Sequence, residues 1–228
     1  YLKEAGLTPK AKPYPNWDGL DGHVGGHYLT AMAINAATGS KECQQRLEYW
    51  INELQACADA NAKNHPEWGR GYVGGVPGSD RIWSAFKKGD FGPYYGSWVP
   101  FYNLHKMYAG LRDAWVYCGN EQAKQLFLGF CDWAIDLTAG LTDAQMERAL
   151  DTEHGGMNEV LADAYAITGE HKYLDVAKRF SHRRLLSALM QRRDILDNMH
   201  ANTTAVILLG FERIAELGGD EAYHTAAR

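Results

Sequence analysis

Residues 101–137 read FYNLHKMYAGLRDAWVYCGNEQAKQLFLGFCDWAIDL, and this stretch decides the fold class. Its first half is apolar around most of a helical circumference, which is typical of a helix buried on nearly all sides. Gly119 then ends the run, because glycine readily takes the left-handed conformation just past a helix end, and Asn120 is a favoured N-cap for a new helix. The second half repeats its apolar residues along one stripe, as a half-exposed helix does. The stretch therefore predicts a hairpin of one inner and one outer helix.

The same junction occurs three more times, where an apolar run ends in glycine before a small or acidic residue and a charged, periodic segment. The four glycines are Gly39, Gly119, Gly169 and Gly219. The apolar runs before them, expected to be inner helices, are Tyr28–Ala37, Phe101–Tyr117, Met157–Ile167 and Ala201–Leu217. The best-defined outer helices are expected over Lys41–Ala60 and Glu121–Leu137. Alternating inner and outer helices favour a toroid over a flat solenoid.

The predicted class is thus all-α, an (α/α)6-toroid or barrel that is incomplete in this chain, with about four helical hairpins. Residues 1–228 are expected to form a single partial (α/α)-barrel domain that is truncated at both ends. Two Gly-rich segments interrupt the pattern, Tyr1–Gly26 and His65–Trp98, the second with a short helical piece near Ile82–Lys88. Long loops of this kind are often lids or binding loops.

Composition excludes several classes of protein. Hydrophobic residues make up 46% and charged residues 22%, as in ordinary globular proteins. The formal net charge of −5 has the wrong sign for a nucleic-acid binder, which normally shows a basic face. No apolar stretch is long enough for a membrane span. The N-terminus has neither an initiator Met nor a signal-peptide pattern, which predicts that the numbering starts inside a longer protein and leaves localisation open.

The four cysteines lie in apolar helical patterns, as small buried hydrophobic residues do; they are Cys43, Cys57, Cys118 and Cys131. Cys43 and Cys57 would be about 21 Å apart along one helix, too far to form a disulfide. A disulfide between other pairs stays open. We expect no metal site and no cofactor from these residues.

Each expected inner helix carries a histidine near its N-terminal end: His27, His105, His154 and His200. In a ring of parallel inner helices these side chains would open onto one shared hollow, where free helix N–H groups suit hydroxyl-rich or anionic ligands. If Pro100 is the first helical residue, His105 lies about one turn inside its helix. Metal binding by the four histidines is a less favoured alternative, since no two of these four stand at the His-x3-His spacing that presets two ligands on one helix face.

Aromatic residues near the same helix ends favour a sugar as the ligand. Trp17 precedes the first inner helix, and Tyr94, Tyr95 and Trp98 precede the second. Carboxylates near these ends are Asp18, Asp21, Asp151, Glu153 and Glu159, of which Glu153 is the best hydrogen-bonding candidate. No pair of them stands out as a catalytic dyad. The expected substrate-binding residues are His27, Trp98, His105, Glu153, His154, His200 and Asn202.

Four blocks of sequence resemble glycoside hydrolase family 127 and fall in the order found in that family. They are GLDGHVGGHYL at residues 19–29, WVPFYNLHK at 98–106, EHGGMNE at 153–159 and HANT at 200–203. The resemblance implies an (α/α)6-barrel catalytic domain of a β-L-arabinofuranosidase-like enzyme that acts on plant cell-wall sugars. It also implies that His27, His105 and His200 are pocket residues.

The resemblance further implies a retaining mechanism with a cysteine nucleophile in a zinc site of cysteines and a glutamate. In the family these groups and the acid/base glutamate belong to a later part of the barrel, and the four cysteines here match none of them. We therefore expect a fragment with no catalytic residue and no metal ligand of its own, inactive alone, with zinc only in the full-length protein. A secreted or periplasmic location is implied by the resemblance alone.

Two other functions stay open at this point. One is a sugar epimerase on the same toroid, in which histidines act as acid/base pairs on one carbon. The other is a helical-repeat scaffold without catalysis that binds a protein partner. We expect a carbohydrate ligand and neither nucleic acid nor membrane as partner. An incomplete barrel would also expose apolar inner-helix surface, which predicts an oligomer.

Overall fold

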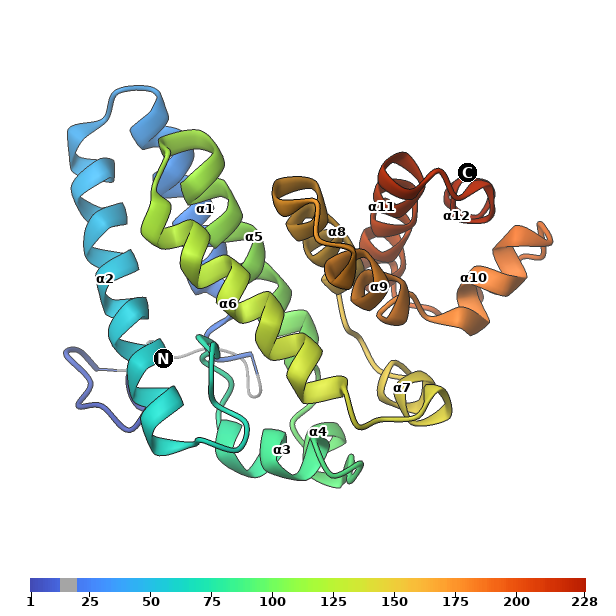
Figure 1. The fold of residues 1–228 in the computed structure, drawn as a ribbon, viewed down its shortest axis with the longest axis horizontal. Coiled ribbons are helices and arrows are strands. Elements are labelled where there is room, and N and C mark those ends of the chain that lie inside the picture. The colour runs from blue at the N-terminus through green and yellow to red at the C-terminus, as the bar shows by residue number, and fades with distance from the viewer. Residues whose placement is uncertain (13–19) are drawn as a thin grey trace. The chain divides into compact units, whose positions relative to one another are not determined.

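The computed structural model describes residues 1–12 and 20–228, and every regular element in them is a helix. The all-α prediction is confirmed. The first six helices are α1 (His23–Ala37), α2 (Lys41–Asn64), α3 (Ser79–Phe86), α4 (Gly92–Tyr95), α5 (Pro100–Cys118) and α6 (Glu121–Thr138). The others are α7 (Asp143–Ala149), α8 (Met157–Thr168), α9 (His171–Arg179), α10 (Arg183–Met190), α11 (Ala201–Gly218) and α12 (Glu221–Ala227) (Figure 1).

The chain separates into two compact units, Tyr1–Gly140 and Leu141–Arg228. Unit 1 contains the hairpins α1–α2 and α5–α6, and unit 2 contains α8–α9 and α11–α12. All four hairpins lie where the glycine junctions predict them. No helix in the described part of the chain combines the length and the apolar character that a membrane span needs.

The hairpin turns use the capping chemistry expected from the sequence. Gly119, Gly169 and Gly219 each follow a helix with positive φ angles of 64°, 73° and 65°. At the start of the next helix, the Asn120 side chain accepts a hydrogen bond from the Ala123 N–H at 2.8 Å. A left-handed glycine followed by a side-chain cap satisfies backbone groups that the two helix ends would leave unpaired.

The interior of unit 1 is built on the apolar stripe of α6. Phe130 of this stripe stacks on Tyr108 of α5 with a centroid distance of 3.9 Å, and Trp133 lies edge-on to Trp83 at 5.1 Å. Trp83 belongs to the Gly-rich segment between α2 and α5, and like Tyr72 of the same segment it is fully buried. Most of His65–Trp98 is loop, as expected, and α3 is the short helical piece expected near Ile82–Lys88, whereas α4 was not expected. Aromatic side chains of this segment pack into the core.

Helices α1 and α5 cross in direct backbone contact at two glycines. A Cβ atom on Gly26 would lie 2.0 Å from the carbonyl oxygen of Lys106, and one on Gly110 would lie 2.6 Å from that of Gly26. α1 begins at His23, five residues before the expected Tyr28, and therefore includes Gly25 and Gly26. From the sequence, Gly25 and Gly26 were expected to lie in a loop before the helix. In the structure they lie within α1, where the absence of a side chain allows close packing against Tyr1 and the backbone of α5.

The four inner helices are not equally buried. α5 and α8 bury most of their residues, as their apolar composition predicts. In α1, however, Val24 and Ile34 are 51% and 47% exposed, and in α11 Leu209 is 60% exposed. The expectation of burial on nearly all sides is wrong for α1 and α11, because each packs on the helices of its own unit along only part of its circumference.

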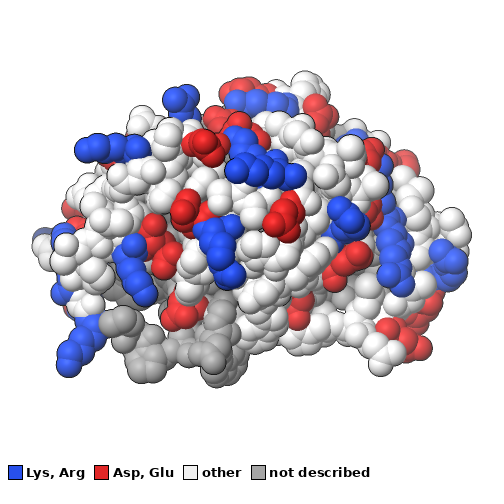
Figure 2. Space-filling view, turned by 90° about the horizontal axis from the view of Figure 1, so that it is seen from below, with Lys and Arg blue, Asp and Glu red and all other residues white. Residues whose placement is uncertain are grey.

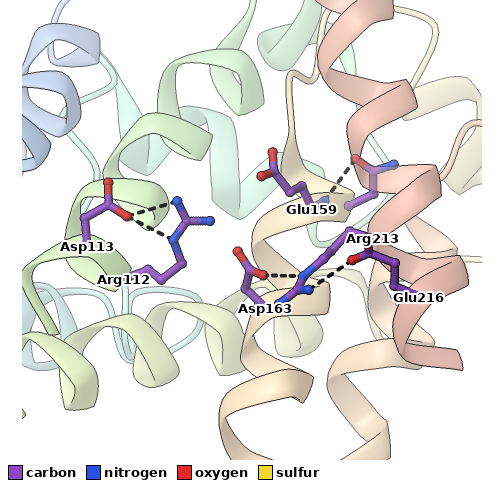
Figure 3. A network of polar contacts seen from close by, with 7 residues as sticks. Arg112, Asp113, Glu159, Asp163, Arg213 and Glu216 are labelled. Carbon is purple, nitrogen blue, oxygen red and sulfur yellow. Dashed lines mark hydrogen bonds and ion pairs between the residues drawn. The ribbon is translucent and has the colours of Figure 1, made fainter. Parts of the chain in front are cut away.

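Polar contacts fix the inner helices within each unit (Figure 3). In unit 2, Arg213 of α11 reaches Asp163 of α8 at 2.8 Å, and the Asp163 carboxylate is largely buried. In unit 1, Asp113 of α5 accepts a hydrogen bond from the Thr30 hydroxyl of α1 at 2.7 Å and also pairs with the neighbouring Arg112. Lys and Arg side chains are interspersed with Asp and Glu on the face that Figure 2 shows.

The α1–α5 contact makes a testable prediction about stability. Gly26→Ala should lower the free energy of unfolding by about 2–3 kcal/mol, because the added methyl group meets backbone atoms of α5 that can move only with the helix. The better helix propensity of alanine offsets less than about 1 kcal/mol of this loss. Urea unfolding followed by circular dichroism measures the change.

Gly140→Ala is the matched control, since a Cβ atom there meets nothing within 4 Å. We expect it to change stability by less than about 0.5 kcal/mol. Equal unfolding midpoints for the two variants would contradict the close helix crossing.

Candidate functional site

The first group of predicted site residues lies at the α1–α5 crossing in unit 1. Because the Gly26 and Lys106 backbones touch, their sequence neighbours His27 and His105 flank the same contact point. His27 is exposed and His105 is half-buried. His105 is the sixth residue of α5, which begins at Pro100, so its expected position one turn inside the helix is confirmed.

Lys106 belongs to this group although the sequence patterns do not single it out. It is 7% exposed, its ammonium donates a hydrogen bond to the Tyr102 carbonyl at 3.2 Å, and Nζ lies 3.2 Å from the centroid of the Tyr102 ring. The sequence could have indicated Lys106, because it is a charged residue directly after His105 in a mainly apolar run. Partial burial of His27 lowers the pKa of its imidazole, and the charges of Lys106 and His23 lower it further.

Trp98 precedes α5 in an unusual backbone conformation. Its φ angle is 65°, which a residue with a large side chain adopts only when the surroundings impose it, and its side chain is 50% exposed. Strained residues of this kind often occur at ligand sites. Of the other predicted aromatic residues, Tyr94 is buried and Tyr95 is 44% exposed. Trp17 lies outside the described residues, as do Asp18 and Gly19.

The second group lies in unit 2, where a contact joins residues 47 positions apart. His200 Nδ1 lies 3.0 Å from Glu153 Oε1, which links the start of α11 to the segment before α8. His200 is the N-cap residue of α11, but its side chain does not cap the helix. With Nδ1–H donating to the carboxylate, Nε2 becomes an acceptor on a ring that is 60% exposed. Asn202, two residues further on, is also exposed.

His154 differs from the other three histidines because it is buried in unit 2. Only 1% of it is exposed, its Nδ1 lies 3.0 Å from the Thr152 carbonyl oxygen, and its Nε2 has no hydrogen-bond partner. Burial lowers the pKa of His154 to about 4, with a smaller lowering from His182, whose ring centroid is 6.1 Å away. The imidazole is therefore neutral at pH 7.

For the remaining predicted carboxylate residues, the contacts that we observe involve the backbone of Asp21 and Glu159 and the carboxylate of Asp151. The Asp21 carbonyl accepts a hydrogen bond from the Asn103 side chain at 2.7 Å. Asp151 lies 3.6 Å from His182 Nε2. The Glu159 N–H donates to the Asn158 side chain at 3.0 Å (Figure 3).

The described residues do not fit the zinc site that the resemblance implies for the full-length protein. They contain no group of three or more His, Cys, Asp or Glu side chains placed to hold a metal ion. The four cysteines are free thiols, of which Cys57 and Cys131 are buried. Burial raises the pKa of the Cys57 thiol to about 11, which keeps it protonated and a poor metal ligand at pH 7.

Unit 2 also has an open hollow of about 450 Å³ that contains none of the predicted site residues. Its lining is formed by Asp143, Asp175, Lys178, Arg179, Arg183, Leu186, Ser187 and Tyr223. Two of the cations are already paired, Lys178 with Asp220 at 3.0 Å and Arg183 with Asp143 at 2.9 Å.

The structure groups His27 with His105 in unit 1, and Glu153 with His200 in unit 2. A hollow shared by all four histidines stays a prediction.

The burial of His154 predicts a pH dependence of stability. Its folded pKa of about 4 lies below the ordinary value of 6.5, so the unfolded chain binds a proton more readily as the pH falls between these values. This contribution to stability should therefore be lost over that window, at up to about 1.4 kcal/mol per pH unit. Urea unfolding at pH 6.5 and pH 4.5 measures the loss.

His154→Asn should reduce this loss, because the variant keeps a donor for the Thr152 carbonyl and removes the titrating group. His171→Asn replaces an exposed histidine of the same unit and serves as the control, with the loss expected to remain. An unchanged pH dependence in His154→Asn would show that its folded pKa is not depressed.

Comparison with known proteins gives a family and a fold. A family model described as beta-L-arabinofuranosidase, GH127 catalytic domain, matches residues 1–228. A solved structure of a GH127 beta-arabinofuranosidase, BT3674, is similar with a TM-score of 0.59 and 16% sequence identity. The match covers 99% of this chain and 35% of that one, so the chain spans about a third of the length of the solved protein. This likeness shows the fold, that of an incomplete α/α toroid. No curated protein matches the sequence.

Proposed function

The chain belongs to the family of GH127 beta-L-arabinofuranosidase catalytic domains, and from this premise we propose that it supplies sugar-binding groups of a glycoside hydrolase acting on β-L-arabinofuranosides or related plant cell-wall glycans. The two units are proposed to be parts of one catalytic domain, as the family match over both of them supports. The proposed substrate-binding residues are His27, Trp98, His105, Glu153, His154, His200 and Asn202.

The contact between His200 and Glu153 is the observation that carries this proposal. Its 3.0 Å geometry orients the imidazole, and in the neutral ring with Nδ1–H donating to the carboxylate, Nε2 is an acceptor. The carboxylate can also accept a hydrogen bond from a sugar hydroxyl. A sugar presents neighbouring hydroxyl groups that can donate to one acceptor and accept from another group. Asn202 adds an exposed amide two residues away, with both a donor and an acceptor.

The side chains of unit 1 suit the same class of ligand. His27 carries a lowered pKa and is a neutral imidazole at pH 7, which both donates and accepts hydrogen bonds. The exposed indole of Trp98 offers an apolar face of the kind that the C–H side of a sugar ring packs against. We assign no catalytic nucleophile among the described residues; of the four cysteines, Cys57 and Cys131 are buried.

Binding of methyl β-L-arabinofuranoside, measured by calorimetry or by NMR shift changes, tests the proposal. His200→Ala and Glu153→Gln should each weaken binding roughly tenfold, since each removes a hydrogen bond to or from a charged group. Because the two side chains act as one unit, the double variant should lose little more than either single variant.

The His224–Glu212 pair of unit 2 provides a matched control, with its own 2.9 Å contact between Nδ1 and a carboxylate. His224→Ala should leave sugar binding unchanged. Additive losses at Glu153 and His200, or equal losses in the control, would mean that their contact is not part of the sugar site. Hydrogen–deuterium exchange into a free sugar without hydrolysis of a β-L-arabinofuranoside would instead favour the epimerase.

A further inference from the structure

A buried amide joins α8 to α11 in unit 2. It belongs to Asn158, which has 0% of its surface exposed. Its Nδ2 donates a hydrogen bond to the Ile207 carbonyl oxygen of α11 at 3.0 Å, and its Oδ1 accepts one from the Glu159 N–H of α8 at 3.0 Å. One end of the amide thus faces an acceptor and the other a donor. Turning the amide over would lose both hydrogen bonds, so its orientation is fixed.

Gly210 of α11 provides the space that the amide occupies. A Cβ atom on Gly210 would overlap the Asn158 side chain at Oδ1, Cγ and Nδ2. Ile207 lies about one turn earlier on the same helix. The two helices therefore meet through one side chain that fits against a glycine and bonds to a carbonyl beside it. Because a hydrogen bond weakens steeply with distance and angle, this contact specifies where α11 stands along α8.

The same two segments carry the Glu153–His200 contact. Glu153 precedes Asn158 by five residues, and His200 precedes Ile207 by seven. The 3.0 Å contact between His200 Nδ1 and Glu153 Oε1 therefore lies about two helical turns along α11 from the Asn158 hydrogen bond. A slide of one helix along the other would change the distance between the imidazole and the carboxylate.

A second polar link between these helices lies further from that contact. Arg213 of α11 pairs with Asp163 of α8 at 2.8 Å (Figure 3). Arg213 follows His200 by thirteen residues, and its side chain is 35% exposed. A long side chain at the surface holds two helices in register less tightly than a short, buried amide does.

We propose that Asn158 is a positioning residue of the sugar site: its buried amide fixes α11 against α8 so that Glu153 meets His200 and holds the ring proton on Nδ1, which leaves Nε2 as an acceptor for a sugar hydroxyl. This inference rests on the proposed function for its ligand. The hydrogen bond at one ring nitrogen decides which tautomer a neutral imidazole adopts. If the carboxylate moves away, the proton can also occupy Nε2, and that acceptor is lost.

The test is the tautomer of His200, read from the 15N NMR signals of its ring in the whole chain at pH 8, where a histidine is ordinarily neutral. His200→Ala assigns the signals. In the unmodified protein the proton should reside mainly on Nδ1. In Asn158→Ala this Nδ1–H form should lose its majority, because the helices lose the hydrogen bond that sets their register.

His224 is the internal control in the same spectra, and His224→Ala assigns it. Its Nδ1 also lies 2.9 Å from a carboxylate, that of Glu212, and this contact joins α12 to α11 rather than to α8. The tautomer of His224 should therefore stay unchanged in Asn158→Ala. An equal change at His200 and His224 would show a general loosening of unit 2 and would overturn the role of Asn158.

The double variant Asn158→Ala/Gly210→Ala separates positioning from packing. The methyl group added at Gly210 fills part of the space that the amide leaves, so urea unfolding should show a recovery of stability relative to Asn158→Ala. The His200 tautomer should stay altered, because the hydrogen bond to Ile207 is still missing. If Asn158→Ala does not fold, the double variant carries the tautomer test alone. A His200 tautomer that recovers together with stability, or that never changes, would overturn the proposal.

The tautomer measurement needs no sugar, so the two proposals can fail separately. Failure of the unmodified protein to bind methyl β-L-arabinofuranoside would count against the proposed function and leave the result for Asn158 standing. A changed His200 tautomer with an unchanged sugar affinity in Asn158→Ala would overturn the role of Asn158 in the sugar site.

Discussion

The close crossing of α1 and α5 is the constraint on which the rest of unit 1 depends. Two glycines remove the side chains that would hold the helices apart, and the backbones meet at Gly26, Lys106 and Gly110. The same contact brings two chain segments about 80 residues apart to one place, because Gly26, which precedes His27, lies against the backbone of Lys106. A packing requirement of the fold therefore also places a candidate ligand group.

In unit 2, polar contacts between side chains hold the inner helices α8 and α11 together. Asp163 and Arg213 join α8 to α11, and Asn158 of α8 hydrogen-bonds to the Ile207 carbonyl at 3.0 Å. With these two helices fixed against each other, the segment before α8 and the start of α11 bring Glu153 to His200. The contact gives the exposed imidazole a defined orientation. In both units, inner helices hold the candidate residues at their N-terminal ends, as expected for an α/α toroid.

The sequence patterns predicted the hairpins because capping is local. A left-handed glycine and a side chain such as Asn120 act within a few residues, so the turn can be read from the chain directly. The start of α1 could not be read in this way. Gly25 and Gly26 look like breakers until the partner helix is known. The packing of the Gly-rich segment before α5 could not be read from the sequence either, since the burial of Tyr72 and Trp83 depends on α6.

The sequence by itself determined the all-α class, the four hairpin turns, the histidines near the helix starts and, through its four motif blocks, the family. These follow from local conformational preferences and from the order of residues along the chain. Only the tertiary structure decided how the environments of the candidates differ: His154 is buried with a lowered pKa, His200 is exposed and paired with Glu153, and Gly26, next to His27, packs against the backbone of α5. Burial and charge proximity depend on residues distant in sequence, so they arise only when the helices pack.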